Sequence, residues 1–155
     1  MKTAVVVQAR TGSSRLPGKV LMPLNGRTVL EEVLHRCRAI PGADAVVCAI
    51  PDLPEDDALV AVAGASGASV VRGSERDVRA RYLVAADAVG AEVVLRVTSD
   101  CPLVDPALCG AVLAVRAAAA VDYCANNLPA SFPHGLDCEA FTTVALRRAA
   151  AADGP

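Results

Sequence analysis

Short apolar runs rich in β-branched residues alternate along this chain with longer segments of helical period. Strands are expected at 3–9, 45–50, 68–72, 92–98 and 122–126, helices at 28–40, 55–66, 76–89 and 106–120, and an irregular segment after 126. The first run, TAVVVQA, is apolar without alternation, which is typical of a strand covered on both faces. The pattern predicts a three-layer α/β domain with a mostly parallel sheet between two layers of helices.

The composition favours one domain over residues 1–155. Its 15 basic and 17 acidic residues give no electrostatic reason to expect nucleic acid or an anionic membrane as a partner. The opening apolar run is too short for a signal peptide, and no run approaches the roughly 18 apolar residues that span a bilayer. We therefore expect a soluble, cytoplasmic protein. Its six cysteines include no C-x-x-C pair, so we expect them to be reduced and mostly buried.

The segment after the first strand carries three cations and no carboxylate. Arg10, Arg15 and Lys19 lie in QARTGSSRLPGKVL, together with two glycines and two serines. This segment matches neither the Walker A nor the G-x-G-x-x-G pattern, and each cation taken singly is typical of a solvated loop. Small residues nevertheless let backbone N–H groups approach a polyanion whose oxygens the cations can reach. Ligands of parallel α/β sheets bind at the carboxyl ends of strands, so the loop is predicted to bind phosphate.

A second polar loop, SDCPLVDP, follows the expected strand 92–98 and should lie at the same edge of the sheet. It carries Asp100 and Asp105. An Asp directly before Pro106 at a helix start is typical of an N-cap, which is the interpretation we give Asp105. Asp100 has two open interpretations, a turn residue or a ligand of Mg²⁺, which takes one or two carboxylates together with phosphate oxygens and water.

Four motifs in order then give the chain a family resemblance. VVQARTGSSRLPGKVL, RGSERDVRARY, RVTSDCPLVDP and FPHGLDCEAF resemble the signatures of cytidylyltransferases of the spore coat polysaccharide biosynthesis protein F type. These are relatives of the CMP-sialic acid and CMP-Kdo synthetases. The resemblance covers nearly the whole chain. It implies a nucleotide-diphospho-sugar transferase (GT-A-like) fold, CTP as donor, Mg²⁺ as cofactor and a homodimer.

The resemblance also implies roles for single residues near the nucleotide. Arg10, Arg15 and Lys19 match the triphosphate-binding loop and would be the catalytic cations. Ala9 and Gly12 match backbone near the nucleotide, and Asp100 matches the metal-binding Asp of a GD-x-P signature. Asp77 and Arg81 become candidate nucleotide or acceptor contacts, whereas the residues by themselves are also typical of a solvated helical face. The candidates for acceptor binding are Asn126, His134, Asp137 and Glu139.

The chain departs from the family pattern at three places. Ser99 stands where relatives usually have Gly, and His134 where they usually have Arg. Relatives also continue past GLDCEAF to a D-T-P-E-D-like segment with a second metal-binding Asp, so the chain resembles a member truncated at its C-terminal end. Asp137 and Glu139 alternate, and would share a face of a strand.

The expected reaction is transfer of CMP from CTP to an acidic sugar or related acceptor, with release of pyrophosphate, in surface polysaccharide or related biosynthesis. Such chemistry depends mainly on positioning and charge neutralisation. Two alternatives stay open from the sequence. One is a glycosyltransferase on the same fold, and the other is a non-catalytic nucleotide-binding subunit.

Overall fold

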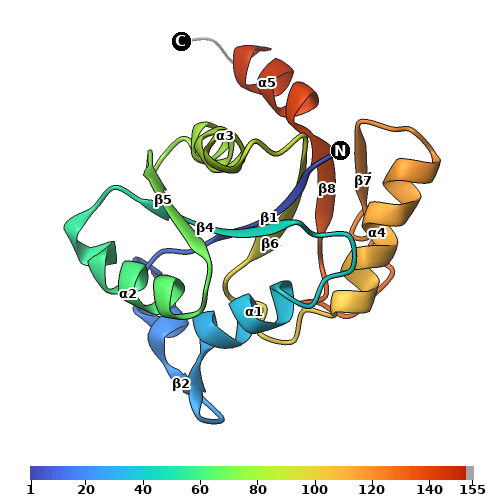
Figure 1. Ribbon diagram of the computed structural model, residues 1–155. Coiled ribbons are helices and arrows are strands. Elements are labelled where there is room, and N and C mark those ends of the chain that lie inside the picture. Colours follow the sequence, from blue (N-terminus) through green and yellow to red (C-terminus); the bar gives the residue numbers. More distant parts are fainter. Residues whose placement is uncertain (153–155) are drawn as a thin grey trace.

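A six-stranded sheet forms the centre of the protein, which a computed structural model describes over residues 1–152 (Figure 1). The strand order is β5-β4-β1-β6-β8-β7. The bounds are β1 Thr3–Gln8, β4 Ala45–Pro51, β5 Ser69–Gly73, β6 Val93–Thr98, β7 Tyr123–Ala125 and β8 Glu139–Thr142. The four strands β5, β4, β1 and β6 are parallel, whereas β8 runs antiparallel to both β6 and β7. The predicted mostly parallel sheet is confirmed.

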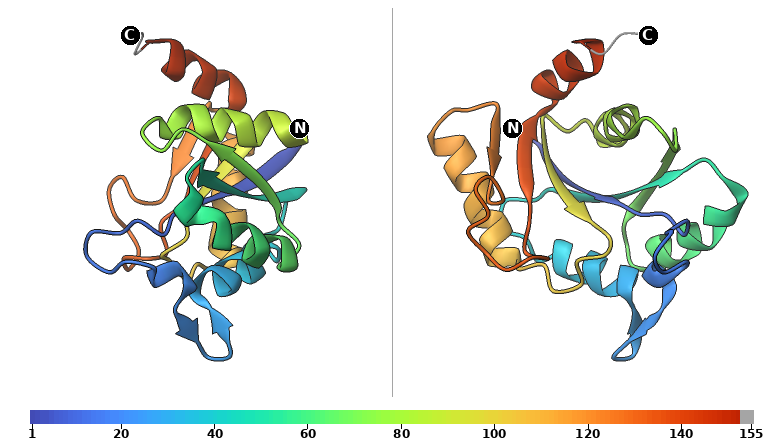
Figure 2. Two further views of the ribbon diagram at one scale, coloured as in Figure 1. Left: turned by 90° about the vertical axis from the view of Figure 1, so that its left-hand side faces the viewer. Right: turned by 180° about the vertical axis from the view of Figure 1, so that it is seen from behind.

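Helices cover both faces of this sheet, which confirms the predicted three layers (Figures 1 and 2). The helices are α1 Val29–Cys37, α2 Asp57–Ala65, α3 Val78–Val89, α4 Pro106–Ala118 and α5 Thr143–Ala152. In the first strand, Val5 and Val7 pack in the core with α1, α2 and α4, while Ala4 and Val6 pack in the core with α3 and α5. The strand is buried on both faces, as its continuous apolar run predicts.

Local sequence signals set several helix starts. Thr28 and Glu31 form a reciprocal capping box, in which Thr28 Oγ1 accepts from the backbone of Glu31 at 3.2 Å. Asp105 caps α4 by accepting from Leu108 N at 3.0 Å, with Pro106 in the first turn. The expected helix 55–66 is divided into the 3-10 turn η2, Pro54–Asp56, and α2. The expected helix 28–40 ends at Cys37.

Two parts of the fold were not predicted. A short hairpin, β2 Pro23–Leu24 and β3 Arg27–Thr28, follows the 3-10 turn η1 Lys19–Leu21. Its turn residues, Asn25 and Gly26, both have positive φ, and an Asn-Gly pair is itself a strong hairpin signal. The chain after residue 126 is also more regular than expected, because it ends in β8 and α5.

The remaining global expectations concern cysteines and membranes. All six cysteines are free, and five of them are buried, as expected. No helix within residues 1–152 is long and apolar enough to cross a bilayer. The last three residues of the expected domain, 153–155, lie outside the described residues.

Candidate functional site

The two polar loops meet at the carboxyl edge of the sheet. β1 and β6 are neighbours, with Gln8 beside Thr98 at their carboxyl ends, so the loops that follow them leave the sheet side by side. Lys19 Nζ donates to Asp100 Oδ2 at 2.7 Å across the gap. The prediction that these loops face each other is confirmed.

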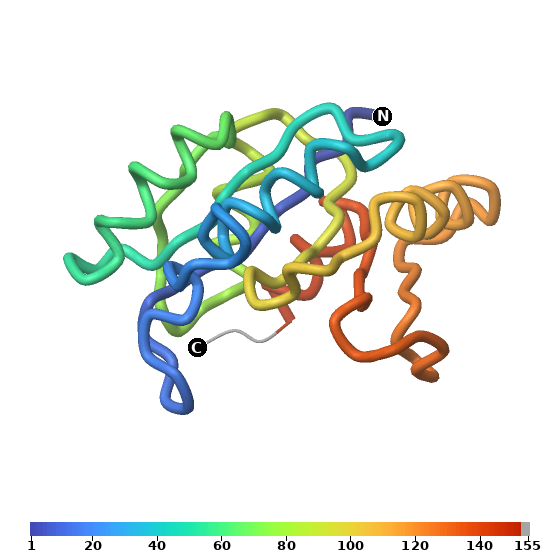
Figure 3. Tube along the Cα trace, turned by 90° about the horizontal axis from the view of Figure 1, so that it is seen from below, coloured from blue at the N-terminus to red at the C-terminus, as the bar shows by residue number. Residues whose placement is uncertain are grey.

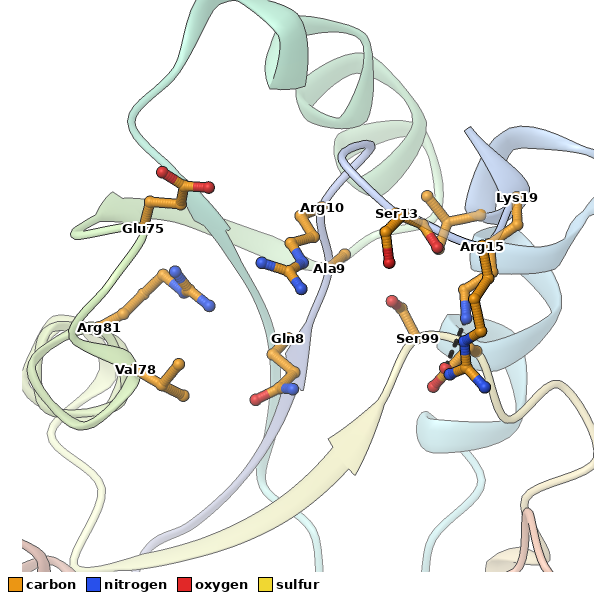
Figure 4. A pocket seen from close by; sticks show the side chains of 13 residues that line it. Gln8, Ala9, Arg10, Ser13, Arg15, Lys19, Glu75, Val78, Arg81 and Ser99 are labelled. Atoms are coloured by element: carbon orange, nitrogen blue, oxygen red, sulfur yellow. Dashed lines mark hydrogen bonds and ion pairs between the residues drawn. The ribbon is translucent and has the colours of Figure 1, made fainter. Parts of the chain in front are cut away.

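A cavity of about 290 Å³ lies between these loops and the start of α3 (Figure 4). Its walls come from the ends of β1, β5 and β6 and from the first turn of α3. The lining residues are Gln8, Ala9, Arg10, Ser13, Ser14, Arg15, Lys19, Val20, Glu75, Val78, Arg81, Ser99 and Asp100. All three predicted phosphate-binding cations line this one cavity, together with the predicted metal ligand.

The first loop is fixed to the body of the domain through Thr11. The backbone N and Oγ1 of Thr11 donate to one carboxylate oxygen of Asp56, at 2.7 and 2.9 Å. Asp56 is only 1% exposed. The carbonyl of Thr11 accepts from the backbone N–H groups of Ser13 and Gly18, each at 2.9 Å, so it ties the two ends of the loop together. Gly18 has φ +68°, a backbone conformation that favours glycine.

Asp56→Ala is therefore expected to destabilise the protein and to loosen the loop. The substitution leaves two donors of Thr11 without their charged partner, and hydrogen bonds to charged groups contribute about 1.5–3 kcal/mol each. We expect the free energy of unfolding in urea to fall by at least about 2 kcal/mol. Asp57→Ala, at the exposed next position, is a neighbouring control. A stability equal to that of the parent would show that Asp56 does not hold the loop.

The cations differ in their present partners. Within the described residues, Arg10 and Arg15 make no hydrogen bond or ion pair, and both are exposed. Lys19 is half-buried and bound to Asp100. Burial by itself would raise the pKa of Asp100, but hydrogen bonds from Lys19 and Thr98 and the charge of Lys19 outweigh it, so the pKa lies below its ordinary value. Asp100 is therefore ionised at neutral pH.

The site fits a magnesium ion that is coordinated by one carboxylate of the protein and mainly by the phosphate oxygens of a bound molecule. The Asp100 side chain is 43% exposed at the cavity wall, with Oδ2 bound to Lys19 and Oδ1 4.0 Å from Sγ of Cys101. No group of three His, Cys, Asp or Glu side chains within residues 1–152 could hold a metal without help. Mg²⁺ asks for one or two carboxylates and completes its shell with phosphate oxygens and water. Asp100 beside the predicted phosphate-binding loop meets that requirement.

Two of the other predicted nucleotide contacts line the cavity and two do not. Ala9 and Arg81 are lining residues. Gly12 and Asp77 stand outside the lining, and Asp77 Oδ1 caps α3 by accepting from Ala80 N at 2.9 Å. Because Asp77 is the N-cap, it precedes the first turn in which the sequence placed it. The roles of Gly12 and Asp77 toward a nucleotide stay predictions.

The predicted acceptor residues are spread over the loop between β7 and β8. Figure 3 shows this loop, in deep orange, at the opposite end of the molecule from α2. The amide of Asn126 bridges the loop, donating to Leu136 O at 2.8 Å and accepting from Cys138 N at 2.9 Å. His134 is exposed, with Nδ1 3.4 Å from an oxygen of Asp137. None of these three predicted residues lines the cavity between the two loops.

Glu139 has a different position, in a second hollow that adjoins the cavity through Gln8 and Val78. Glu139 forms an ion pair with Arg96 on the neighbouring strand β6, and accepts from Tyr123 Oη at 3.1 Å. The hollow encloses about 380 Å³. The other residues that line it are Arg79, Tyr82, Phe141 and Leu146. The site places Glu139 apart from Asp137, which lies outside β8.

Sequence reasoning missed several lining residues of the cavity. Gln8, Ser13, Ser14, Glu75, Val78 and Ser99 were not among the candidates. Most of them lie at the ends of β1 and β6 or in the loops that follow β1 and β5. The rule that ligands bind at the carboxyl ends of parallel strands could have found these positions, had it been applied to every strand.

Comparison with known proteins places the chain in a family. Residues 4–135 match the family described as cytidylyltransferase. The chain is 42% identical over 107 residues to the spore coat polysaccharide biosynthesis protein SpsF of Bacillus subtilis (strain 168). The aligned stretch covers 66% of this chain and 45% of that protein. The chain spans about 45–60% of the length of the first curated relatives that it matches.

Solved structures agree with this result. A cytidylyltransferase from Leptospira borgpetersenii serovar Hardjo-bovis superposes with a TM-score of 0.95 at 31% identity, over 100% of this chain and 66% of that one. CMP:2-keto-3-deoxy-manno-octonic acid synthetase complexed with CTP gives a TM-score of 0.80 at 17% identity, over 100% of this chain and 80% of that one, which is a likeness of fold alone. The motifs, the fold and the family match agree: this chain belongs to the cytidylyltransferase family.

Proposed function

We propose that this chain binds CTP in the cavity at the carboxyl edge of the sheet and transfers CMP to an acceptor, with release of pyrophosphate. The observation that carries the proposal is the meeting of a three-cation loop and an ionised carboxylate in one cavity of a cytidylyltransferase family member. The description of the matched family as cytidylyltransferase supports the choice of nucleotide.

The side chains have distinct tasks in this reaction. An acceptor oxygen attacks the α-phosphorus, a new oxygen–phosphorus bond forms, and the bond between the α-phosphorus and the bridging oxygen breaks. Arg10, Arg15 and Lys19 bind the β- and γ-phosphates and stabilise the charge that develops on pyrophosphate. The anchored loop holds these cations in place, which lowers the entropic cost of reaching the transition state. An attacking hydroxyl gives up its proton to solvent.

Asp100 is the residue that would hold Mg²⁺. The ion, when bound with the nucleotide, supplies charge neutralisation on phosphate oxygens. Asp100 lies beside Lys19, with Nζ 2.7 Å from Oδ2, so the carboxylate and the cation would act next to each other on the same phosphates. We propose an acidic sugar or a related acidic molecule as acceptor, in surface polysaccharide or related biosynthesis, and a homodimer as the assembly. The relationship to SpsF supports the pathway.

Calorimetry with the four ribonucleoside triphosphates in Mg²⁺ tests the nucleotide assignment. We expect CTP to bind more tightly than UTP, ATP or GTP. Equal binding of all four would contradict the assignment of cytidine and leave only a phosphate site. A pyrophosphate-release assay with CTP and a panel of acidic acceptors tests the transfer itself. Binding of CTP without release of pyrophosphate for any acceptor would show a nucleotide-binding protein rather than an enzyme.

A further inference from the structure

The nucleotide cavity has two chemically different sides. Figure 4 shows Arg15 and Lys19 on one side and Glu75 and Arg81 on the other, with Arg10 between them. The first side suits the phosphates of a nucleotide. The second side holds a carboxylate and a guanidinium, which is a poor environment for more phosphate because the carboxylate repels it. Glu75 can therefore interact favourably with a ligand group that donates hydrogen bonds.

Glu75 is an acidic side chain whose charge acts on the nearby guanidinium of Arg81. It follows β5 and lines the cavity, and within residues 1–152 it makes no hydrogen bond or ion pair. A solvent-facing acid with no hydrogen-bonding partner is ordinary at a surface, but here the acid stands in the wall of a cavity that is otherwise rich in cations. It opposes the binding of an anionic ligand unless it contacts a donor on that ligand.

Arg81 is held rigidly beside it. The side chain is only 4% exposed, and Nη1 donates to the carbonyl of Ser74. A Cβ on Gly73 would lie 3.3 Å from Cγ of Arg81, so the end of β5 lies close against the aliphatic part of the Arg81 side chain on α3. The Nε atom has no partner within the described residues. Because Nε is buried, the donors that Arg81 can present to the cavity are those of its terminal Nη atoms, and Nη1 is already held by Ser74.

We infer that Glu75 and Arg81 read the base of the bound nucleotide and select cytosine against uracil; this rests on the proposed binding of CTP. Cytosine carries an amino donor at N4 and acceptors at N3 and O2. A carboxylate at Glu75 accepts from N4, and the guanidinium of Arg81 donates to the acceptors. Uracil has an acceptor, O4, in place of the amino group and a donor at N3. It would set O4 against the carboxylate and N3–H against the guanidinium.

The arrangement gives selectivity by repulsion as well as by attraction. A site built to hydrogen-bond a substrate group discriminates strongly against an analogue that lacks it, because the polar groups of the site are then left unpaired. Val78, on the first turn of α3, lines the same side and offers an apolar surface for a ring. The base side thus combines one acceptor, one donor and one apolar contact.

Glu75→Gln tests the inference with little risk to folding, because the side chain is exposed. A glutamine amide can accept from N4 or, after rotation, donate to O4, so it no longer distinguishes the two bases. We expect the ratio of the UTP and CTP dissociation constants, measured by calorimetry, to fall by about tenfold relative to the parent. Glu55→Gln removes the same charge at a position outside the lining and should leave the ratio unchanged.

A second probe isolates the amino group. The triphosphate of pyrimidin-2-one riboside keeps N3 and O2 but has no group at position 4. The parent should bind it about tenfold more weakly than CTP, and Glu75→Gln should reduce that difference. A parent that prefers CTP, with the same preference in Glu75→Gln, overturns the inference and leaves the proposed function intact. A parent that binds CTP and UTP equally also overturns it. A parent that binds no nucleotide overturns the proposed function itself.

Discussion

Arg15→Ala is expected to weaken the binding of CTP by about tenfold to hundredfold while leaving the binding of CMP nearly unchanged. Charge-assisted hydrogen bonds contribute about 1.5–3 kcal/mol each, which corresponds to that range of affinity. Arg15 makes no hydrogen bond or ion pair with another side chain within the described residues, so its removal breaks no such interaction. Calorimetry with CTP and CMP on the same preparation measures both effects.

The control for this result is a cation of the same type on the far side of the molecule. Arg148, on α5, is exposed and lies outside the cavity lining. Arg148→Ala changes the net charge equally and should leave the affinities for CTP and CMP as they are in the parent. An equal loss for CTP and CMP in Arg15→Ala would mean that Arg15 contacts the α-phosphate or supports the fold.

Asp100→Asn is expected to keep the fold and to abolish the dependence of CTP binding on Mg²⁺. Asparagine preserves the size and most of the hydrogen-bonding capacity that the turn uses, but it removes the charge that a hard cation requires. The measurement is the affinity for CTP with Mg²⁺ and with a chelator, together with a thermal melt. A variant that melts like the parent and still needs Mg²⁺ would show that the ion is held elsewhere.

Asp105→Asn is the matched control on the same loop. Asparagine is about as good an N-cap as aspartate, so α4 keeps its start, and the variant loses the same single charge. It should retain the full effect of Mg²⁺. If both variants lost that effect, the cause would be the general negative charge of the loop rather than a ligand at Asp100.

The sequence supports the general layout of this protein well because the layout depends on local patterns. The continuous run at 3–9 becomes a strand buried on both faces, and the rule for parallel sheets brings together Lys19 and Asp100, which are 81 positions apart in the sequence. The same reasoning is weaker at the chain's later part. β8 has only four residues and adds antiparallel to β6, so neither its length nor its direction follows from the alternation that precedes it.

The contacts of single residues are harder to predict from the sequence, for a different reason. Asp56 falls at the start of the expected helix 55–66, where the helix dipole favours an acid, and the sequence gives it no other role. In the structure it turns inward to Thr11, 45 residues away, and local sequence contains no trace of that contact. Glu139 likewise finds Arg96 only because β8 and β6 pair in one particular register. Contacts between distant segments are set by the assembled sheet.

The ion pair between Lys19 and Asp100 would couple the binding of the two ligands that we propose for this site, the triphosphate and Mg²⁺. A triphosphate that binds Lys19 and a cation that binds Asp100 must each break the ion pair between these two side chains. The ligand that binds first provides the free energy to break it, so the second ligand binds without that loss. The two affinities then rise together, and by reciprocity each ligand increases the affinity for the other by the same factor. Before either ligand binds, Lys19 and Asp100 neutralise each other, so neither side chain attracts other ions from solution into the cavity.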